Sequence, residues 1–223
     1  MPLKASGRSS GIETIDRFDG GVGWIAHPEE TLERASHALV VDDAVWLVDP
    51  LDAPGVDELL DEFDEIAGVV VLLDRHMRDA ATFADRYDVP VYLPAPIDRM
   101  PETDRIERIS GSLPGTRYRT ITVLDKPGWH EVALYDETTA TMVVPEALAT
   151  IPSFRAGPER LGVHPALRLF PPRVLRRYTP ERILVGHGRG VFENATEALR
   201  AAIDGSRRRA PSVYINSLNE LFS

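Results

Sequence analysis

The chain has 223 residues, a formal net charge of −10 and no cysteine. This length can bury a sizeable core, and 43% hydrophobic residues argue against a disordered polymer. The lack of cysteine excludes disulfides, iron–sulfur clusters, thiolate zinc sites and a cysteine nucleophile. Because nucleic acids and anionic membrane surfaces are negatively charged, the excess of carboxylates makes both unfavourable partners.

The basic residues are almost all arginines, since only Lys4 and Lys126 are lysines. Many carboxylates with few lysines are typical of a salt-adapted or GC-rich source. The segment Met1–Gly11 lacks the apolar core of a signal peptide. The longest apolar run, Val69–Leu73, is far shorter than the roughly 20 residues that cross a bilayer. We therefore expect a soluble cytoplasmic protein.

The first half of the chain predicts alternating strands and helices. Two apolar runs around a short polar turn predict a hairpin, and apolar residues at helical spacing predict the helices. Such a βαβαβ order predicts an α/β fold in which part of the sheet is parallel. The predicted elements are a hairpin over Ser36–Pro50, helices over Gly55–Ala67 and Asp79–Tyr87, and buried strands over Val69–Leu73 and Val89–Leu93.

The second half predicts strands first and short helical segments later. Prolines and charges without periodicity predict a loop over Pro94–Pro114, and frequent prolines limit Pro145–Pro180 to short helices. No internal repeat or linker divides the sequence, so we expect one domain over residues 1–223, with residues 1–20 as a flexible end. The remaining predicted elements are strands over Tyr118–Leu124, His130–Tyr135, Ala140–Val144 and Ile183–Val185, a helix over Phe192–Ile203 and a solvated basic turn at Arg207–Arg209.

Polar residues that can carry chemistry follow several of the predicted strands. The segment Asp74–Asp79 comes directly after a buried strand, and Gly186–Gly188, which contains His187, follows the last one. His130 lies near the start of its strand, and Glu146 follows another. Because ligands collect beyond the carboxyl ends of buried strands, we expect a site at this edge of the fold.

The order of these motifs resembles that of the metallo-β-lactamase-fold hydrolases, over roughly residues 36 to 203. In that family a first hairpin closes on an Asp-Pro-like turn, which is matched by Trp46–Pro50, and the metal motif HxHxDH follows a buried strand, where Leu72–Met77 lies. The resemblance implies a four-layer αββα sandwich with mixed sheets. The family's Pro-Gly-His, Gly-Asp and Gly-His-Gly segments are matched by Lys126–His130, Pro145-Glu146 and Gly186–Gly188.

The resemblance also implies an altered first metal site. Leucine and tryptophan cannot bind zinc, so the first site is expected to be lost. A shift of the alignment is also open; it would put Asp79 in the aspartate position and Arg75 in a histidine position, which suits a metal less well. Without a gap, the HxHxDH positions fall on Leu72, Asp74, His76 and Met77, and the next histidine position falls on Trp129.

At the second metal site the resemblance implies three ligands. His76, Glu146 and His187 would hold one divalent ion, zinc or iron, because two imidazoles and a carboxylate are a competent donor set. A fourth position would then be open for water, whose pKa a bound metal lowers.

Two functions from different classes remain open. The first is a metal-dependent hydrolase with a mononuclear site, acting on a small ester, thioester, lactone or phosphodiester. Asp74 or Asp79 would accept the proton of the attacking water. Arginines near the cleft, such as Arg75, Arg78 or Arg189, would favour an anionic group on the substrate.

The second function is that of a non-catalytic binding or scaffold protein that has lost its metals. The apolar residues Leu72, Met77 and Trp129 at ligand positions favour this alternative. The sequence contains no Gly-x-Ser-x-Gly elbow, phosphate loop or dinucleotide fingerprint, so other α/β enzyme classes lack their signatures.

Each candidate residue also has a structural interpretation. Asp74 could cap a helix, Glu146 could begin one, and His187 could be hydrogen-bonded at a glycine turn. His130 is one residue beyond the family's histidine and could instead be a cross-strand partner. His164 lies in the proline-rich segment, as a lid residue over the cleft or as a structural loop histidine.

Overall fold

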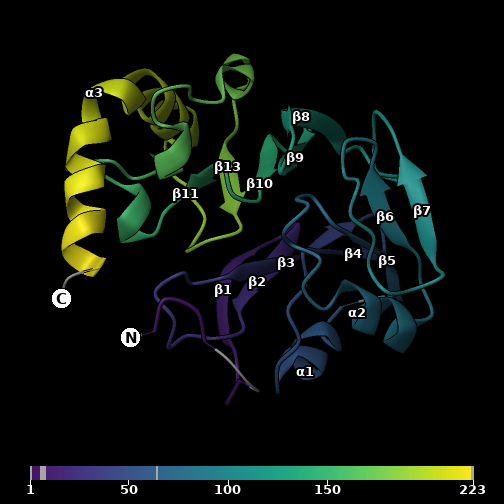
Figure 1. Cartoon of the computed structure of the whole chain (residues 1–223). Coiled ribbons are helices and arrows are strands. Elements are labelled where there is room, and N and C mark those ends of the chain that lie inside the picture. Colours follow the sequence, from purple (N-terminus) through teal and green to yellow (C-terminus); the bar gives the residue numbers. More distant parts are fainter. Residues whose placement is uncertain (1, 6–8, 64, 222–223) are drawn as a thin grey trace.

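The computed structural model describes residues 2–5, 9–63 and 65–221, and its core consists of two β-sheets (Figure 1). The first sheet has seven strands in the order β1-β2-β3-β4-β5-β6-β7, and the second has four in the order β13-β10-β9-β8. The first sheet contains β1 (Glu13–Phe18), β2 (Gly21–Ile25), β3 (Ala35–Val41), β4 (Ala44–Val48), β5 (Glu65–Val70), β6 (Val91–Pro94) and β7 (Ile106–Ile109). The second contains β8 (Arg119–Lys126), β9 (Trp129–Asp136), β10 (Thr141–Val144) and β13 (Arg182–Val185).

Helices cover the outer face of each sheet. In β4, Val45 and Leu47 belong to the apolar cluster shared with α1 (Val56–Leu60) and α2 (Ala80–Tyr87). The alternate residues of the same strand belong to the cluster between the two sheets, because successive side chains of a strand point to opposite faces. On the far side, α3 (Ala195–Leu221) packs on the four-stranded sheet. These layers confirm the predicted αββα sandwich.

Both sheets mix parallel and antiparallel pairs, as predicted. Strands β4 to β7 are parallel neighbours, and β10 is parallel to β13. The sheets also meet at one edge, where Ala35 N donates to Gly186 O at 2.9 Å and Val132 N donates to Leu72 O at 2.9 Å. The carboxyl ends of β5, β10 and β13 therefore lie close together.

Short segments connect the sheets and helices over the edge where these strands end. They contain a two-stranded ribbon and three short 3₁₀ turns. These elements are β11 (Leu148–Ala149), β12 (Gly162–Val163), η1 (Pro152–Phe154), η2 (Pro165–Leu167) and η3 (Arg173–Arg177). They agree with the short helices predicted for this proline-rich part.

Three predictions for the first half are wrong. The strand predicted over Val69–Leu73 lies earlier in the chain, because β5 ends at Val70. The helix predicted over Gly55–Ala67 ends at Leu60, and β5 begins at Glu65. Ile66, which fits the helical spacing, instead pairs with Val45 of β4, so sheet pairing prevails over local periodicity. The predicted loop over residues 94–114 contains β7, which pairs with β6.

Both ends of the described chain are more ordered than predicted. Residues 13–18 of the expected flexible end form β1, which pairs with β2. The basic segment Arg207–Arg209 is not a terminal turn, because α3 continues to Leu221 and includes Pro211. Buried Val213 holds this extension against the rest of the protein. Among the described residues, no helix is long and apolar enough to cross a bilayer.

Candidate metal centre

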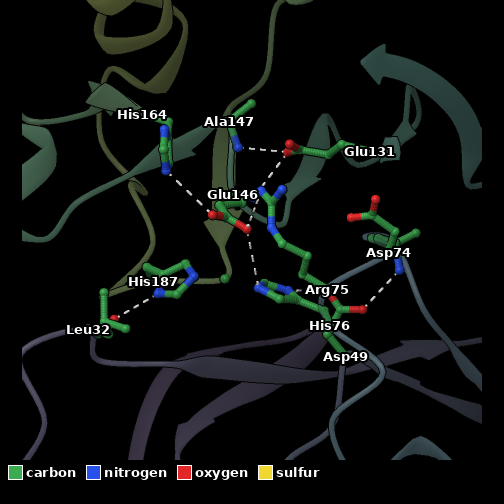
Figure 2. A network of polar contacts seen from close by, with 12 residues as sticks. Leu32, Asp49, Asp74, Arg75, His76, Glu131, Glu146, Ala147, His164 and His187 are labelled. Atoms are coloured by element: carbon green, nitrogen blue, oxygen red, sulfur yellow. Dashed lines mark hydrogen bonds and ion pairs between the residues drawn. The ribbon is translucent and has the colours of Figure 1, made fainter. Parts of the chain in front are cut away.

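The three residues predicted as metal ligands come together at the shared sheet edge. His76 follows β5, Glu146 follows β10 and His187 follows β13. Each offers one ligand atom, and these atoms all lie within 4.8 Å of one another (Figure 2). Both histidines are 6% exposed, so the three residues form a largely buried triad.

Fixed hydrogen bonds orient both imidazoles of the triad. His76 Nδ1 lies 3.0 Å from Asp49 Oδ2, and His187 Nδ1 lies 2.8 Å from Leu32 O. Because both partners are acceptors, each Nδ1 carries the proton and each Nε2 keeps a lone pair. The Nε2 atom of His76 lies 3.8 Å from Glu146 Oε2. A carboxylate or carbonyl behind a metal-binding histidine is the usual supporting arrangement.

The charge states of the triad suit a divalent ion. Burial lowers the pKa of His187 to about 3, and burial together with Arg78 lowers the pKa of His76. Burial alone would raise the pKa of Glu146, but the hydrogen bond from His164 and the nearby Arg75 outweigh it and lower the pKa to about 2. The triad thus presents two neutral imidazoles and one carboxylate.

This donor set fits one zinc or iron ion. Tetrahedral ligands about 2.1 Å from a zinc ion lie about 3.4 Å apart, so the triad atoms, which lie within 4.8 Å of one another, would need to approach by up to about 1.4 Å. The guanidinium of Arg78 would compete with an ion for the lone pair of His76. Arg78 Nη2 lies 3.4 Å from His76 Nε2, and Arg78 Nη1 donates to Ala35 O at 2.6 Å and Asp49 O at 2.8 Å.

The solvent side of the triad is lined by cationic and aromatic side chains. Arg75 Nη2 lies 3.2 Å from Glu146 Oε2, and His164 Nε2 lies 3.5 Å from Glu146 Oε1. The Arg75 guanidinium stacks over Trp129 at 4.2 Å. His164 packs edge-on against both Trp129 and Phe154, with ring centroids 4.8 Å apart in each pair. The side chains of Arg75, Trp129 and His164 therefore lie between Glu146 and the solvent.

Glu131 of β9 is a supporting residue that the sequence analysis missed. It is fully buried, and its Oε1 accepts hydrogen bonds from Glu146 N at 3.0 Å and Ala147 N at 2.7 Å. Its Oε2 accepts from Trp129 Nε1 at 2.8 Å. Burial raises the pKa of Glu131 to about 7. The signal in the sequence was a carboxylate on a strand face that is otherwise apolar.

Asp49 is a second supporting residue, known from the sequence only as part of the Asp-Pro turn. It is 3% exposed and has a left-handed backbone with φ of 45°. Its Oδ1 accepts from Leu72 N at 2.9 Å, while Oδ2 holds His76. A non-glycine residue in this strained backbone conformation lowers the stability of the fold, and such strain is common at functional sites. The conformation of Asp49 therefore agrees with a role in orienting the triad.

The described contacts do not bring Asp74, Asp79 or His130 to the triad. Asp79 Oδ2 accepts from Asp52 N at 2.8 Å. The ring of His130 bonds Asp125, its cross-strand neighbour on β8, at 2.8 Å, and its backbone N donates to Asp74 Oδ2 at 3.1 Å. The predicted proton acceptors therefore point elsewhere, while Arg75, Arg78 and His164, predicted as neighbours, do line the site.

Comparisons with known proteins give structural matches alone. No model of a known family matches the sequence, and no curated protein matches it. A crystal structure of DIM-1 metallo-β-lactamase exposed to ceftazidime has a TM-score of 0.64 at 10% identity, covering 92% of this chain and 99% of that chain. The apo state of the chemotaxis sensor ODP from T. denticola has a TM-score of 0.62 at 15% identity, covering 94% and 100%.

A third match is the metal-soaked flavodiiron core of Flv1 from Synechocystis sp. PCC6803. Its TM-score is 0.63 at 12% identity, and the match covers 91% of this chain and 62% of that one. Another ODP structure contains a peroxy diiron species. Structural matches at such low sequence identity establish the fold and do not establish the activity. The chain has the metallo-β-lactamase fold.

Proposed function

We propose that the chain binds one divalent ion, zinc or iron, through His76, Glu146 and His187, and hydrolyses a small-molecule substrate there. The observation that supports this proposal is the convergence of the triad, in which acceptors hold the Nδ1 atom of each histidine so that each Nε2 keeps its lone pair. A divalent ion supplies a Lewis acid that activates water and polarises a substrate oxygen.

The surrounding residues would each serve this chemistry in a specific way. Asp49 keeps the proton of His76 on Nδ1, and Glu131 fixes the backbone that carries Glu146. Because Asp74 and Asp79 do not reach the triad, we do not assign proton transfer to them. His164 Nε2 lies 3.5 Å from Glu146 Oε1, and because its Nδ1 accepts from Ala166 N, His164 serves as a hydrogen-bond donor beside the triad.

The test is metal analysis of protein purified without chelator. We expect about one equivalent of zinc or iron per chain in the wild type and its loss in His187→Ala, because two ligands hold an ion poorly. His130→Ala is the matched control, since His130 bonds Asp125 and not the triad. A wild type that stays metal-free after reconstitution, or a His187→Ala variant that keeps its metal, contradicts the proposal.

The second candidate function is a metal-free binding protein, and one observation favours it. Arg78 points at the lone pair of His76, and Arg75 pairs with Glu146, so two guanidinium groups already neutralise this centre without an ion. Leu72 is packed in the core between the sheets. This candidate predicts that adding zinc leaves the thermal midpoint unchanged, whereas a triad that binds zinc must raise it.

A further inference from the structure

Among the arginines expected near the cleft, Arg75 is the one that is both beside the triad and open to solvent. Its side chain is 39% exposed. Arg78 turns inward and donates to backbone oxygens such as Ala35 O. Arg189 pairs with Glu13 at an exposed position. A ligand that approaches the triad from solvent therefore meets the Arg75 guanidinium.

The orientation of Arg75 is set before any ligand arrives. Its guanidinium stacks over Trp129 at 4.2 Å, and its Nη1 donates to Gly128 O at 3.0 Å. The indole is fixed in turn, because Trp129 Nε1 donates to the buried Glu131 at 2.8 Å. A guanidinium that is already ordered loses little side-chain entropy when it binds an anion.

A second donor lies on the other side of Glu146. His164 Nδ1 accepts a hydrogen bond from Ala166 N at 3.1 Å, so its Nε2 carries the proton. Figure 2 shows His164 and Arg75 flanking the Glu146 carboxylate, whose two oxygens they contact at 3.5 and 3.2 Å. The pair is thus already arranged around one carboxylate.

The charges of the centre point to an anionic ligand. Arg75 and Arg78 offset Glu146 and Asp49. A divalent ion would add two positive charges, which leaves the centre positive even when Glu131 is ionised. A buried or partly buried centre with excess positive charge favours an anion beside it.

We propose that Arg75 and His164 form an anion subsite, so that the substrate carries a carboxylate or phosphate group next to the bond that is hydrolysed. When Glu146 serves as a metal ligand, the anion of the substrate takes its place as acceptor for Arg75 and His164. This inference rests on the proposed function, because it needs Glu146 to be engaged by the ion.

The test is calorimetric titration of the zinc-loaded protein with inorganic phosphate and, separately, with acetate. Loss of one charge-assisted hydrogen bond weakens binding by about 10-fold or more. We expect this loss in Arg75→Gln, with its zinc content unchanged, and a smaller loss in His164→Gln. Arg176→Gln is the matched control, since Arg176 is also an exposed arginine paired with a carboxylate, that of Asp204 at 2.7 Å.

The outcomes separate the two proposals. If wild type and Arg75→Gln bind zinc and bind both anions equally well, the ion alone holds the anion, and the subsite is wrong while the metal centre stands. If the wild type binds no zinc, the proposed function itself fails. When Arg75→Gln affects one probe more strongly, that probe identifies the substrate group as a phosphate or a carboxylate.

Discussion

Two buried polar clusters in this molecule are built in opposite ways. In the first, fully buried Arg168 donates to both carboxylate oxygens of Glu159, at 2.9 and 2.7 Å, and to Val163 O at 3.1 Å. Arg209 adds a further contact to Glu159 at 3.2 Å. Within the described residues, no buried side-chain atom of this Glu159 cluster is left without a partner.

The candidate metal centre is the second cluster, and it is incompletely satisfied. Among the described residues of this centre, Arg78 Nε is buried without a hydrogen-bond partner. Asp49 and Arg78 have left-handed backbones, with φ of 45° and 42°. Since buried polar groups are normally paired, unpaired and strained ones mark places where a ligand or a function compensates. The complete pairing of the Glu159 cluster agrees with a role in stability, and the unpaired and strained groups of the candidate metal centre agree with the binding role that we propose.

The largest expected effect comes from breaking the Glu159 cluster. Arg168→Met leaves the carboxylate of Glu159 buried with Arg209 as its remaining cation, and removing one partner of a buried pair costs about 3–5 kcal/mol. We expect a large fall of the urea midpoint, with zinc content per folded chain unchanged.

The control for that variant is Arg176→Met, which breaks the exposed pair with Asp204. Exposed ion pairs contribute little to stability, so its midpoint should stay close to that of the wild type. Equal midpoints for Arg168→Met and Arg176→Met would contradict the structural role assigned to the Glu159 cluster.

A change at Asp49 of the candidate metal centre is expected to have the opposite effect, a loss of metal affinity with little loss of stability. In Asp49→Asn the amide oxygen can still accept from Leu72 N, which turns the NH₂ group toward His76. The proton of His76 then moves to Nε2, and the lone pair needed for a metal is lost. Changes to such supporting groups lower metal affinity by about 10–100-fold, while the urea midpoint should change little.

Zinc affinity measured by chelator competition checks this expectation. Asp136→Asn is the matched control, because Asp136 is also buried and accepts from a backbone N–H, that of Thr138 at 2.8 Å. Unchanged zinc affinity in Asp49→Asn, or an equal loss in Asp136→Asn, would contradict the role of Asp49 in orienting His76 for metal binding.

The triad could be predicted from two kinds of information. Its members follow short apolar strands whose carboxyl ends meet at one edge, and the resemblance to metallo-β-lactamase-fold hydrolases selected His76, Glu146 and His187 among the polar residues there. Glu131 and Asp49 could not be assigned in this way. Their roles depend on contacts with Ala147 and Leu72, which lie just beyond other strands, so these contacts depend on how the strands pair.

The fold shows the same limit. The β3–β4 hairpin was predictable from local apolar runs, whereas β1 and β2 were missed. Strand β1 buries one large apolar side chain, Ile15, and β2 contains Gly21 and Gly23. Glycine is unfavourable in strands, and here it is required: a Cβ at Gly21 would lie 2.1 Å from Ala38 O. The close approach of β2 and β3 therefore requires glycine, and the glycines interrupt the run of apolar residues that would have predicted β2 as a strand.

The smallest expected effect concerns the contact that ties the loop after His187 to β1. Both carboxylate oxygens of Asp16 accept from Gly190 N, at 2.9 and 2.8 Å, and Asp16 has a φ of 52°. Burial raises the pKa of Asp16 from 3.8 to about 6. The folded state thus holds the proton more tightly than the unfolded state, so the stability this group contributes is present below about pH 4 and is lost as the pH rises through about 6.

Asp16→Asn removes this titration while keeping an oxygen that accepts from Gly190 N. A shift of about two pKa units corresponds to about 1–3 kcal/mol, so the stability of the wild type relative to Asp16→Asn should fall by that amount between about pH 4 and pH 7. Urea unfolding of both proteins at several pH values measures the difference. If the difference in stability between the two proteins stayed constant from about pH 4 to pH 7, Asp16 would be ionised throughout this range. The contact of Asp16 with Gly190 would then be as well satisfied as those of the Glu159 cluster.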